Sequence, residues 1–414
     1  MSKTKHHATP YDVVLYGATG FVGRQTVQYF AESSAVKGAV KVHGLRWALA
    51  GRSQSKLEQT RRDCAGAAGA GIVVAAADDI EALDALAKST RVVLSTAGPF
   101  ALYGSALVAA CVKHGTHYVD ITGETPWAAS MIALHHEAAA KNATRIIPFC
   151  GFDSVPSDLG AWLLTQAMLA KHQTPCVNVT AAFSLRGGVN GGTLASLLNI
   201  MEGKQAGQLA DPYLLNPAAS RPLSKGLDPD PAGPLHSPQF DAWLAPFFMS
   251  VINTRVVRRS AALLGYGPDF HYQEYLRLGK GVAAGIGATL ISAGTGVSKA
   301  ALGLSSVRRA AAALMPKAGQ GPSVASMNSG SYRCELIGKN ASGDLRKVTV
   351  ADQGDPGNRG TCKMVCEAAL CLATDTGKLP GGPGYGGVLT PASGLGNALV
   401  DRLRAAGMTL QVGQ

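Results

Sequence analysis

A glycine-rich turn between an apolar run and a helical segment is the feature that most constrains this chain. Residues 13–16 read Val-Val-Leu-Tyr, and three glycines then follow at a spacing of three. Strand, glycine turn and helix in this order open a dinucleotide-binding fold, because the helix N-terminus offers N–H groups to a pyrophosphate. The alternative is a tight turn that binds nothing. We expect the turn to hold a dinucleotide through Gly17, Thr19, Gly20, Phe21, Val22 and Gly23.

Strand and helix patterns alternate up to residue 150. Apolar strand-like runs occupy residues 45–50, 71–77, 91–97, 117–121 and 145–150, with helical patterns between them. This alternation is typical of parallel sheets with right-handed crossovers. The sequence therefore predicts an α/β fold whose N-terminal domain, residues 11–150, is a Rossmann domain with a doubly wound parallel sheet.

The tip of the second expected strand indicates which dinucleotide binds. Arg52 and Ser53 follow this strand, and no acid is present to meet a free ribose 2′-hydroxyl. A guanidinium suits a 2′-phosphate, so NADP is expected rather than NAD. Asp78 follows the third strand and is expected either near the adenine or as a helix cap. The loop after the fourth strand is expected beside the nicotinamide ribose, through Ala97, Gly98, Pro99 and Phe100.

The pattern changes after residue 150. A helix is expected over residues 243–264, an antiparallel pair over 331–338 and 346–352, and helices over 362–374 and 392–406. We therefore expect a second, α+β domain over residues 151–385, preceded by a flexible tail at 1–10 and the Rossmann domain. Residues 386–414 are expected to pack back on the Rossmann domain.

Candidates for the catalytic acid come from strand ends. No tyrosine has a lysine four residues later, which argues against an ordinary short-chain dehydrogenase. Tyr118 lies in the fifth strand, near the edge where open α/β sheets bind ligands. Asp153 and Ser154 lie where the chain enters the second domain, and helix capping is their competing interpretation. Asp120 and Glu124, at the end of the fifth strand, also stay open as candidates for the acid. The sequence does not choose one proton donor, and Tyr118, Asp153 and Ser154 are the leading candidates.

The composition limits which partners and ligands the protein can be expected to bind. The net charge is +11, but the basic residues are scattered and no nucleic-acid motif accompanies them, so nucleic acid is not expected. The eight cysteines are expected to be reduced thiols in the cytoplasm, and none is expected to bind a metal. Residues 281–306 form an apolar stretch with one lysine. It is expected to be a helical insert in the core, or a surface that touches lipid or an acyl chain.

Several motifs together resemble the saccharopine dehydrogenase-like oxidoreductases, and within them the trans-acting enoyl reductase branch. The motifs are residues 17–23, 50–53, 97–100, 118–120 with 123–124, 151–156 and 387–392. The resemblance covers essentially the whole chain and implies an NADP-binding Rossmann domain followed by an α+β domain. It also implies reduction of a carbon–carbon double bond on an acyl chain carried by a synthase, and relatives that contact membranes.

Two other functions stay open at this point. A saccharopine-type dehydrogenase of imines or amino acids would need basic residues in the cleft to hold carboxylates, and the second half offers Arg186, Arg255, Arg277 and Arg333. A non-catalytic NADP-binding protein associated with lipid would use residues 281–306 as its contact. The leading hypothesis is an NADPH-dependent reductase that acts on an apolar or carrier-bound acyl substrate.

Overall fold

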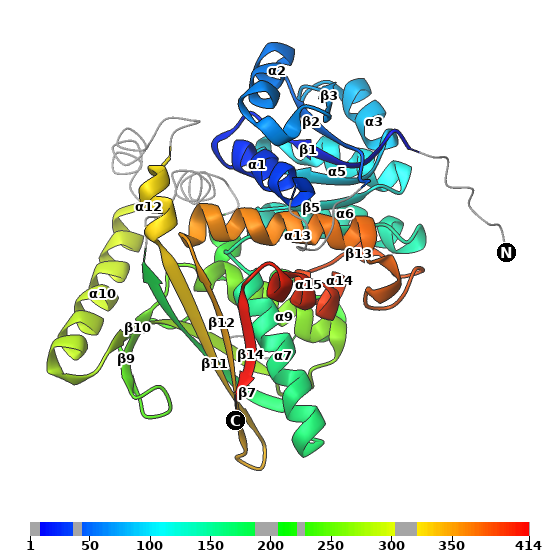
Figure 1. Ribbon diagram of the computed structural model, residues 1–414. Helices are drawn as coiled ribbons and strands as arrows, with labels where there is room; N and C mark the ends of the chain where they lie inside the picture. The colour runs from blue at the N-terminus through cyan, green and yellow to red at the C-terminus, as the bar shows by residue number, and fades with distance from the viewer. Residues whose placement is uncertain (1–8, 36–43, 187–205, 222–227, 303–320, 414) are drawn as a thin grey trace.

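The computed structural model describes residues 9–35, 44–186, 206–221, 228–302 and 321–413, which fold around two seven-stranded sheets (Figure 1). Residues 1–8 of the expected tail and residues 303–306 of the apolar stretch lie outside this part of the chain. The first sheet is built largely from the first 150 residues, and the second from residues 176–413. The predicted fold class, a Rossmann domain followed by an α+β domain, is confirmed.

Every neighbouring pair of strands in the first sheet is parallel, and the order is β13-β6-β5-β4-β1-β2-β3. Most residues of the inner strands are buried, because a parallel sheet is covered on both faces. The strands are β1 (Tyr11–Tyr16), β2 (Trp47–Gly51), β3 (Gly71–Val74), β4 (Thr90–Ser95), β5 (His117–Asp120), β6 (Arg145–Ile147) and β13 (Gly387–Val388).

Helices from both ends of the chain cover this sheet. The N-terminal ones are α1 (Phe21–Ala35), α2 (Gln54–Asp63), α3 (Ile80–Lys88), α4 (Phe100–Tyr103), α5 (Ser105–His114) and α6 (Thr125–Lys141). Helix α13 (Thr361–Thr374) packs beside α1 and against β4 and β5, and it lies between the two sheets (Figure 1). The Tyr29 hydroxyl on α1 donates to Glu367 Oε1 on α13 at 2.7 Å. A helix made late in the sequence thus completes the first domain.

The second sheet is mixed, with the order β14-β12-β11-β7-β10-β9-β8. Strands β7 and β10 are parallel, whereas β11 runs antiparallel to both β7 and β12. Helices α7 (Val155–His172) and α9 (Ser250–Leu264) pack on this sheet. The strands are β7 (Cys176–Arg186), β8 (Leu235–Ser237), β9 (Ala242–Pro246), β10 (His271–Gly279), β11 (Ser331–Asn340), β12 (Leu345–Gln353) and β14 (Thr409–Gly413).

The C-terminal segment contributes to both sheets. Strand β13 pairs with β6 at the edge of the first sheet, and β14 pairs with β12 at the edge of the second. The remaining elements are short turns and helices: η1 (Ala65–Ala67), η2 (Ala206–Ala210), η3 (Ala218–Ser220), α10 (Gly281–Leu302), α12 (Val324–Ser329), η4 (Pro356–Gly360), η5 (Thr376–Lys378), α14 (Pro391–Gly394) and α15 (Gly396–Ala405).

Two expected helices differ from the structure. The helix expected over 243–264 is wrong at its start, because residues 242–246 pair with β10 as strand β9. The helix expected over 392–406 is divided between α14 and α15, and Gly396 has a positive φ of 50° at the division. The apolar stretch forms one helix, α10, up to Leu302. Within the described residues, no helix combines the length and apolar character needed to span a membrane.

Candidate functional site

The three glycines of the first turn have separate structural roles. Gly17 has φ +85°, and a Cβ there would lie 2.9 Å from Ala97 N, so the β1 and β4 loops approach closely at this residue. A Cβ on Gly23 would lie 2.1 Å from Gly17 O, which only glycine permits. Gly20 is exposed, and the atom nearest to a Cβ built on it is Gly17 O at 3.3 Å. Gly17 and Gly23 therefore shape the turn, and Gly20 leaves its outer side open to a phosphate next to the first N–H groups of α1.

Arg52 and Asp78 both lie close enough to Tyr16 for their charges to affect its phenol. Burial and the nearby Asp78 carboxylate raise the pKa of the Tyr16 phenol to about 12, against the opposing charge of Arg52. Asp79, not Asp78, caps α3, because its carboxylate accepts from Ala82 N at 3.0 Å. Both Arg52 and Asp78 are exposed, and Ser53 is half-buried next to Arg52. The strand tips thus present one guanidinium and one carboxylate beside the glycine turn.

The loop from Ala97 to Phe100 is held in place by Glu124. The buried Glu124 carboxylate accepts from Phe100 N at 2.8 Å through Oε1 and from Ala101 N at 2.9 Å through Oε2. Gly98 and Pro99 are joined by a cis peptide bond, and Phe100 packs against the Trp127 ring with centroids 5.6 Å apart. Glu124 therefore fixes the loop that adjoins the glycine turn.

Asp153 is a half-buried carboxyl group at the junction of the two domains. A Cβ built on Gly123 would lie 3.1 Å from Asp153 Oδ2 and 3.1 Å from Ile252 Cδ1, so the carboxyl lies between the loop after β5 and helix α9. Within the described residues it makes no side-chain hydrogen bond or ion pair, and it does not cap α7. Burial raises the pKa of Asp153 to about 7. This group is thus partly protonated near neutral pH.

Ser154 is fully buried and belongs to a polar network. Its hydroxyl donates to Asn253 Oδ1 at 3.2 Å, and Asn253 Nδ2 donates to Glu274 Oε1 at 2.7 Å. Glu274 Oε2 accepts from Ser157 Oγ at 2.8 Å and from the Tyr272 hydroxyl at 3.0 Å. Burial raises the pKa of Glu274 to about 7 although these three donors lower it. The network ties the start of α7 to α9 and β10.

A second buried carboxylate binds the C-terminal segment to the same helices. Asp158 Oδ1 accepts from Ser260 Oγ at 2.5 Å, and Asp158 Oδ2 accepts from Ala392 N at 2.7 Å. Thr390 lies 2.5 Å from the Ser260 hydroxyl and caps α14. Burial raises the pKa of Asp158 to about 7 as well. Asp158, Asn253 and Glu274 were not predicted as site residues, because only the tertiary fold brings them together.

Tyr118 lies inside the first sheet. Its side chain is fully buried, and the hydroxyl faces Asp120 and Ser95 without a well-formed hydrogen bond to any described residue. Burial and Asp120 raise the pKa of Tyr118 well above its usual value. Burial also raises the pKa of Asp120 to about 7, although Thr122 N and Phe149 N donate to its Oδ1.

The four arginines considered for substrate carboxylates do not form one cluster. Arg255 is buried on α9 and pairs with Asp230. Arg277 and Arg333 both pair with Glu335 on the outer face of the second sheet. Arg186 is exposed at the end of β7. Within the described residues, none of these four arginines forms a hydrogen bond or ion pair with Asp153, so they do not assemble a carboxylate-binding site around it.

Comparison with known proteins agrees with these features. Residues 13–147 match the saccharopine dehydrogenase NADP binding domain. A Mycobacterium tuberculosis protein assigned provisionally as a trans-acting enoyl reductase is 38% identical over 425 residues, covering 98% of both chains. The trans-acting enoyl reductase of Mycobacterium leprae is 36% identical over 423 residues, covering 97% of both chains.

A solved structure matches the fold at low sequence identity. Apo saccharopine dehydrogenase (L-Glu forming) from Saccharomyces cerevisiae superposes with a TM-score of 0.53 and 12% identity, covering 97% of this chain and 99% of that chain. The open glycine turn and Arg52 fit the NADP that the matched domain binds. The chain is an NADP-dependent oxidoreductase with a saccharopine dehydrogenase-type NADP-binding domain, and it belongs to the trans-acting enoyl reductase family.

Proposed function

We propose that this protein reduces the double bond of an α,β-unsaturated acyl thioester, with an apolar acyl chain presented on a carrier. The names of its relatives support this reaction class, and the chain covers 97% of the Mycobacterium leprae relative. The observation that carries the proposal is Asp153, whose carboxyl has no partner among the described residues and has a pKa of about 7. Such a group can donate a proton at neutral pH.

NADPH, when bound, supplies the hydride that the β carbon receives. We propose that residues 17–23, with Arg52, Ser53 and Asp78, hold it, and that Ala97, Gly98, Pro99 and Phe100 line its nicotinamide end. The α carbon must then receive a proton, and Asp153 donates it from its carboxyl group. Glu124 keeps the loop at 97–101 in place through its two backbone hydrogen bonds. The network at Ser154 keeps the backbone that carries Asp153 fixed.

Asp153 is preferred over the other two candidates for physical reasons. The Ser154 hydroxyl already donates to Asn253 and is fully buried. The Tyr118 hydroxyl is fully buried, and its pKa lies well above the usual value. Of the three, Asp153 combines partial exposure with a titration near neutral pH. We therefore assign Ser154 a positioning role and treat Tyr118 as the rival acid.

Replacing Asp153 by Asn tests the assignment. The kcat for a crotonyl thioester should fall by a factor on the order of 100 or more, because a positioned general acid contributes that much. In the parent protein, kcat should fall as the pH rises through about 7, where the Asp153 carboxyl loses its proton. The affinity for NADPH, measured by fluorescence titration, should not change.

Tyr118→Phe and Ser154→Ala are the matched controls. Tyr118→Phe should keep its kcat and the same pH profile, whereas Ser154→Ala should lose activity modestly. If the fall of kcat with rising pH disappears in Tyr118→Phe but persists in Asp153→Asn, the proton comes from Tyr118. If the protein turns over an amino-acid imine and no enoyl thioester, the saccharopine-type alternative replaces the enoyl reduction.

We also propose that the protein, in the cytoplasm, contacts a membrane reversibly through α10. Val282, Ile286 and Leu290 are 80%, 57% and 67% exposed, and their spacing of four places them along one side of the helix. Changing all three to Ser should abolish co-flotation with anionic phospholipid vesicles. Equal flotation of both proteins would show that this side of α10 is not the contact.

A further inference from the structure

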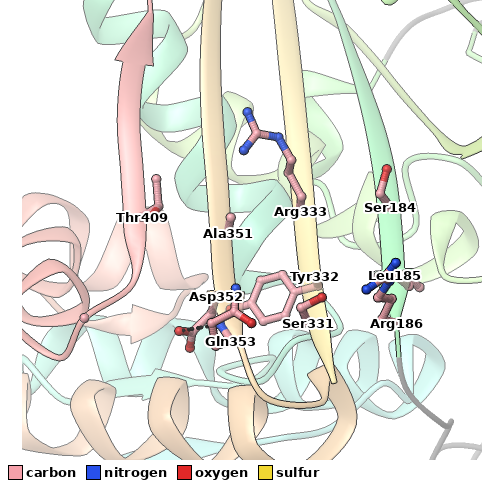
Figure 2. A pocket seen from close by; sticks show the side chains of 11 residues that line it. Ser184, Leu185, Arg186, Ser331, Tyr332, Arg333, Ala351, Asp352, Gln353 and Thr409 are labelled. Carbon is pink, nitrogen blue, oxygen red and sulfur yellow. Dashed lines mark hydrogen bonds between the residues drawn. The ribbon is translucent and has the colours of Figure 1, made fainter. Parts of the chain in front are cut away.

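A polar groove lies on the outer face of the second sheet, away from the aromatic core. Its volume is ≈ 430 Å³, and it runs across the ends of β7, β11, β12 and β14 (Figure 2). Side chains alternate between the two faces of a strand, so Ser184, Arg186, Ser331 and Arg333 point to this face. The neighbouring Phe183 and Tyr332 point to the opposite face and are buried there. The groove is thus separate from the packed side of the sheet.

Positive charge dominates the groove. Arg186 and Arg333 come from adjacent strands, where Ser331 is opposite Arg186 and Arg333 is opposite Ser184. Arg186 forms no ion pair within the described residues. Asp352 lies opposite Tyr332, so its side chain points to the packed face, where Lys363 Nζ lies 2.7 Å from its Oδ2. Hydroxyl and amide groups from Ser184, Ser331 and Gln353 supply further hydrogen-bonding atoms.

The positive region continues along the same face around one carboxylate. Glu335 pairs with Arg277, with Lys347 at 2.6 Å and with Arg333 at 3.3 Å. Burial alone would raise the pKa of Glu335, but these cations hold it below its usual range. Three cations therefore pair with one carboxylate, and Arg186 adds a fourth positive charge farther along the same face. A surface with this excess of positive charge fits a negatively charged partner.

The groove lies at the end of the sheet that faces the cofactor-binding domain (Figure 1). Strand β11 begins just after α12, and β12 ends just before η4. Gly321, which precedes α12, lies against the Phe21 ring, and η4 contacts α1. Beyond η4, the Cys362 thiol lies 3.8 Å from Val22 O. Strands β11 and β12, two of the four strands at the groove, are thus connected to segments that contact the start of α1.

We propose that this basic groove docks the carrier domain that delivers the acyl substrate. A carrier-bound acyl group is a thioester of a phosphopantetheine arm, and a phosphodiester attaches this arm to the carrier. Arg186 and Arg333 suit this phosphodiester and acidic side chains around it, since guanidinium groups bind phosphate and carboxylate oxygens in pairs. The groove is open to the surface and carries two guanidinium groups, unlike an enclosed apolar ligand pocket. This inference rests on the proposed enoyl reduction.

Charge reversal at the groove tests the inference. Two substrates are compared, crotonyl-pantetheine and an isolated acyl carrier domain loaded with a crotonyl-phosphopantetheine arm. In Arg333→Glu and Arg186→Glu, kcat/KM for the loaded carrier should fall by about tenfold each, chiefly through KM. The same ratio for crotonyl-pantetheine, which lacks both the phosphate and the carrier, should stay within about twofold. Arg62→Glu, an exposed change on α2, is the matched control and should alter neither substrate.

Salt provides a second readout, because exposed charge attraction is screened. The parent protein's kcat/KM for the loaded carrier should fall as salt rises, and the fall should be shallower in Arg333→Glu. If charge reversal lowers turnover of both substrates equally, or of neither, the groove is not the docking surface. If the parent protein reduces neither substrate, the enoyl reduction fails, and direct binding of the loaded carrier decides the docking separately. Binding that Arg333→Glu abolishes supports docking; absence of binding, or equal binding by both proteins, overturns it.

Discussion

The two sheets differ in where the groups of the candidate site lie. In the first sheet, the groups suited to a ligand, Gly20, Arg52 and Asp78, are exposed in the loops just beyond the strand ends. In the second sheet, polar groups are buried within the packed face, where Glu274 accepts three hydrogen bonds. Residues close in sequence thus form the cofactor site, whereas the substrate side is assembled from distant parts of the chain.

This difference predicts different consequences of mutation. A change in the loops of the first sheet should affect cofactor binding strongly, because those groups meet the ligand directly. A change in the buried network of the second sheet should first cost stability, because burial penalises any unpaired polar group. The following substitutions test that division.

Gly23→Ala should have the largest effect. A Cβ at this position would lie 2.1 Å from Gly17 O, a backbone atom that cannot move aside as a flexible side chain could. We expect a loss of about 2–3 kcal/mol in the free energy of unfolding, as for an overpacked interior site. NADPH binding should disappear with it, measured by fluorescence titration. Gly69→Ala, where a Cβ meets nothing within 4 Å, is the control and should bind NADPH normally.

Glu274→Gln should cost about 2 kcal/mol of stability, measured by urea unfolding, because one acceptor becomes a donor that faces other donors. The pH dependence adds a second test. The folded-state pKa of about 7 lies above the usual glutamate value of 4.5, so the folded chain binds this proton more tightly. The free energy of unfolding therefore falls as the pH rises from about 4.5 to about 7. Glu274→Gln should flatten that fall, and an unchanged slope would show that Glu274 does not titrate in this range.

Arg52→Ala should weaken NADPH binding by about tenfold, which corresponds to about 1.4 kcal/mol. NADH lacks the 2′-phosphate, so its affinity should change little. Arg62→Ala on the same surface is the control, because Arg62 pairs with Glu58 within α2. Equal losses of affinity for NADPH and NADH in Arg52→Ala would mean that Arg52 does not bind the 2′-phosphate.

The smallest effect is expected at two neighbouring acids. Asp79→Ala removes the cap of α3 and should cost about 1 kcal/mol of stability without a change in NADPH affinity. Asp78→Ala leaves the cap intact and should change NADPH affinity a few-fold with little loss of stability. Thermal unfolding and NADPH titration of both variants separate the two roles. A reversed outcome would mean that these neighbours exchange their functions.

The first domain was predictable because its signals are local. Apolar runs, the glycine spacing and Arg52 lie within short segments, and each has one dominant physical interpretation. The second domain was harder to predict. Strand β10 was not predicted, and Glu274 occupies one of its inward positions, where an apolar residue would have signalled a strand. The strand over 242–246 was taken as the start of a helix, since only pairing with β10 defines it.

The candidate site was predictable to the level of segments. Residues 151–156 were expected at the junction, and Asp153 lies there. The difference between Asp153 and Ser154 depends on Asn253, which is about a hundred positions away and shows no local motif. Similarly, the sequence offers Arg255 as a ligand for substrate carboxylates. In the structure Arg255, Arg258 and Arg259 are buried and bond to carbonyl groups.

The position of α13 has a consequence for how the protein is made. During synthesis, β1 to β6 leave the ribosome long before residues 361–374, yet α13 packs over β4 and β5. Part of the sheet of the nascent first domain therefore stays uncovered until α13 has been synthesised, a condition that favours aggregation or chaperone binding. The NADP-binding half is first in the gene but cannot reach its final state until translation is almost complete.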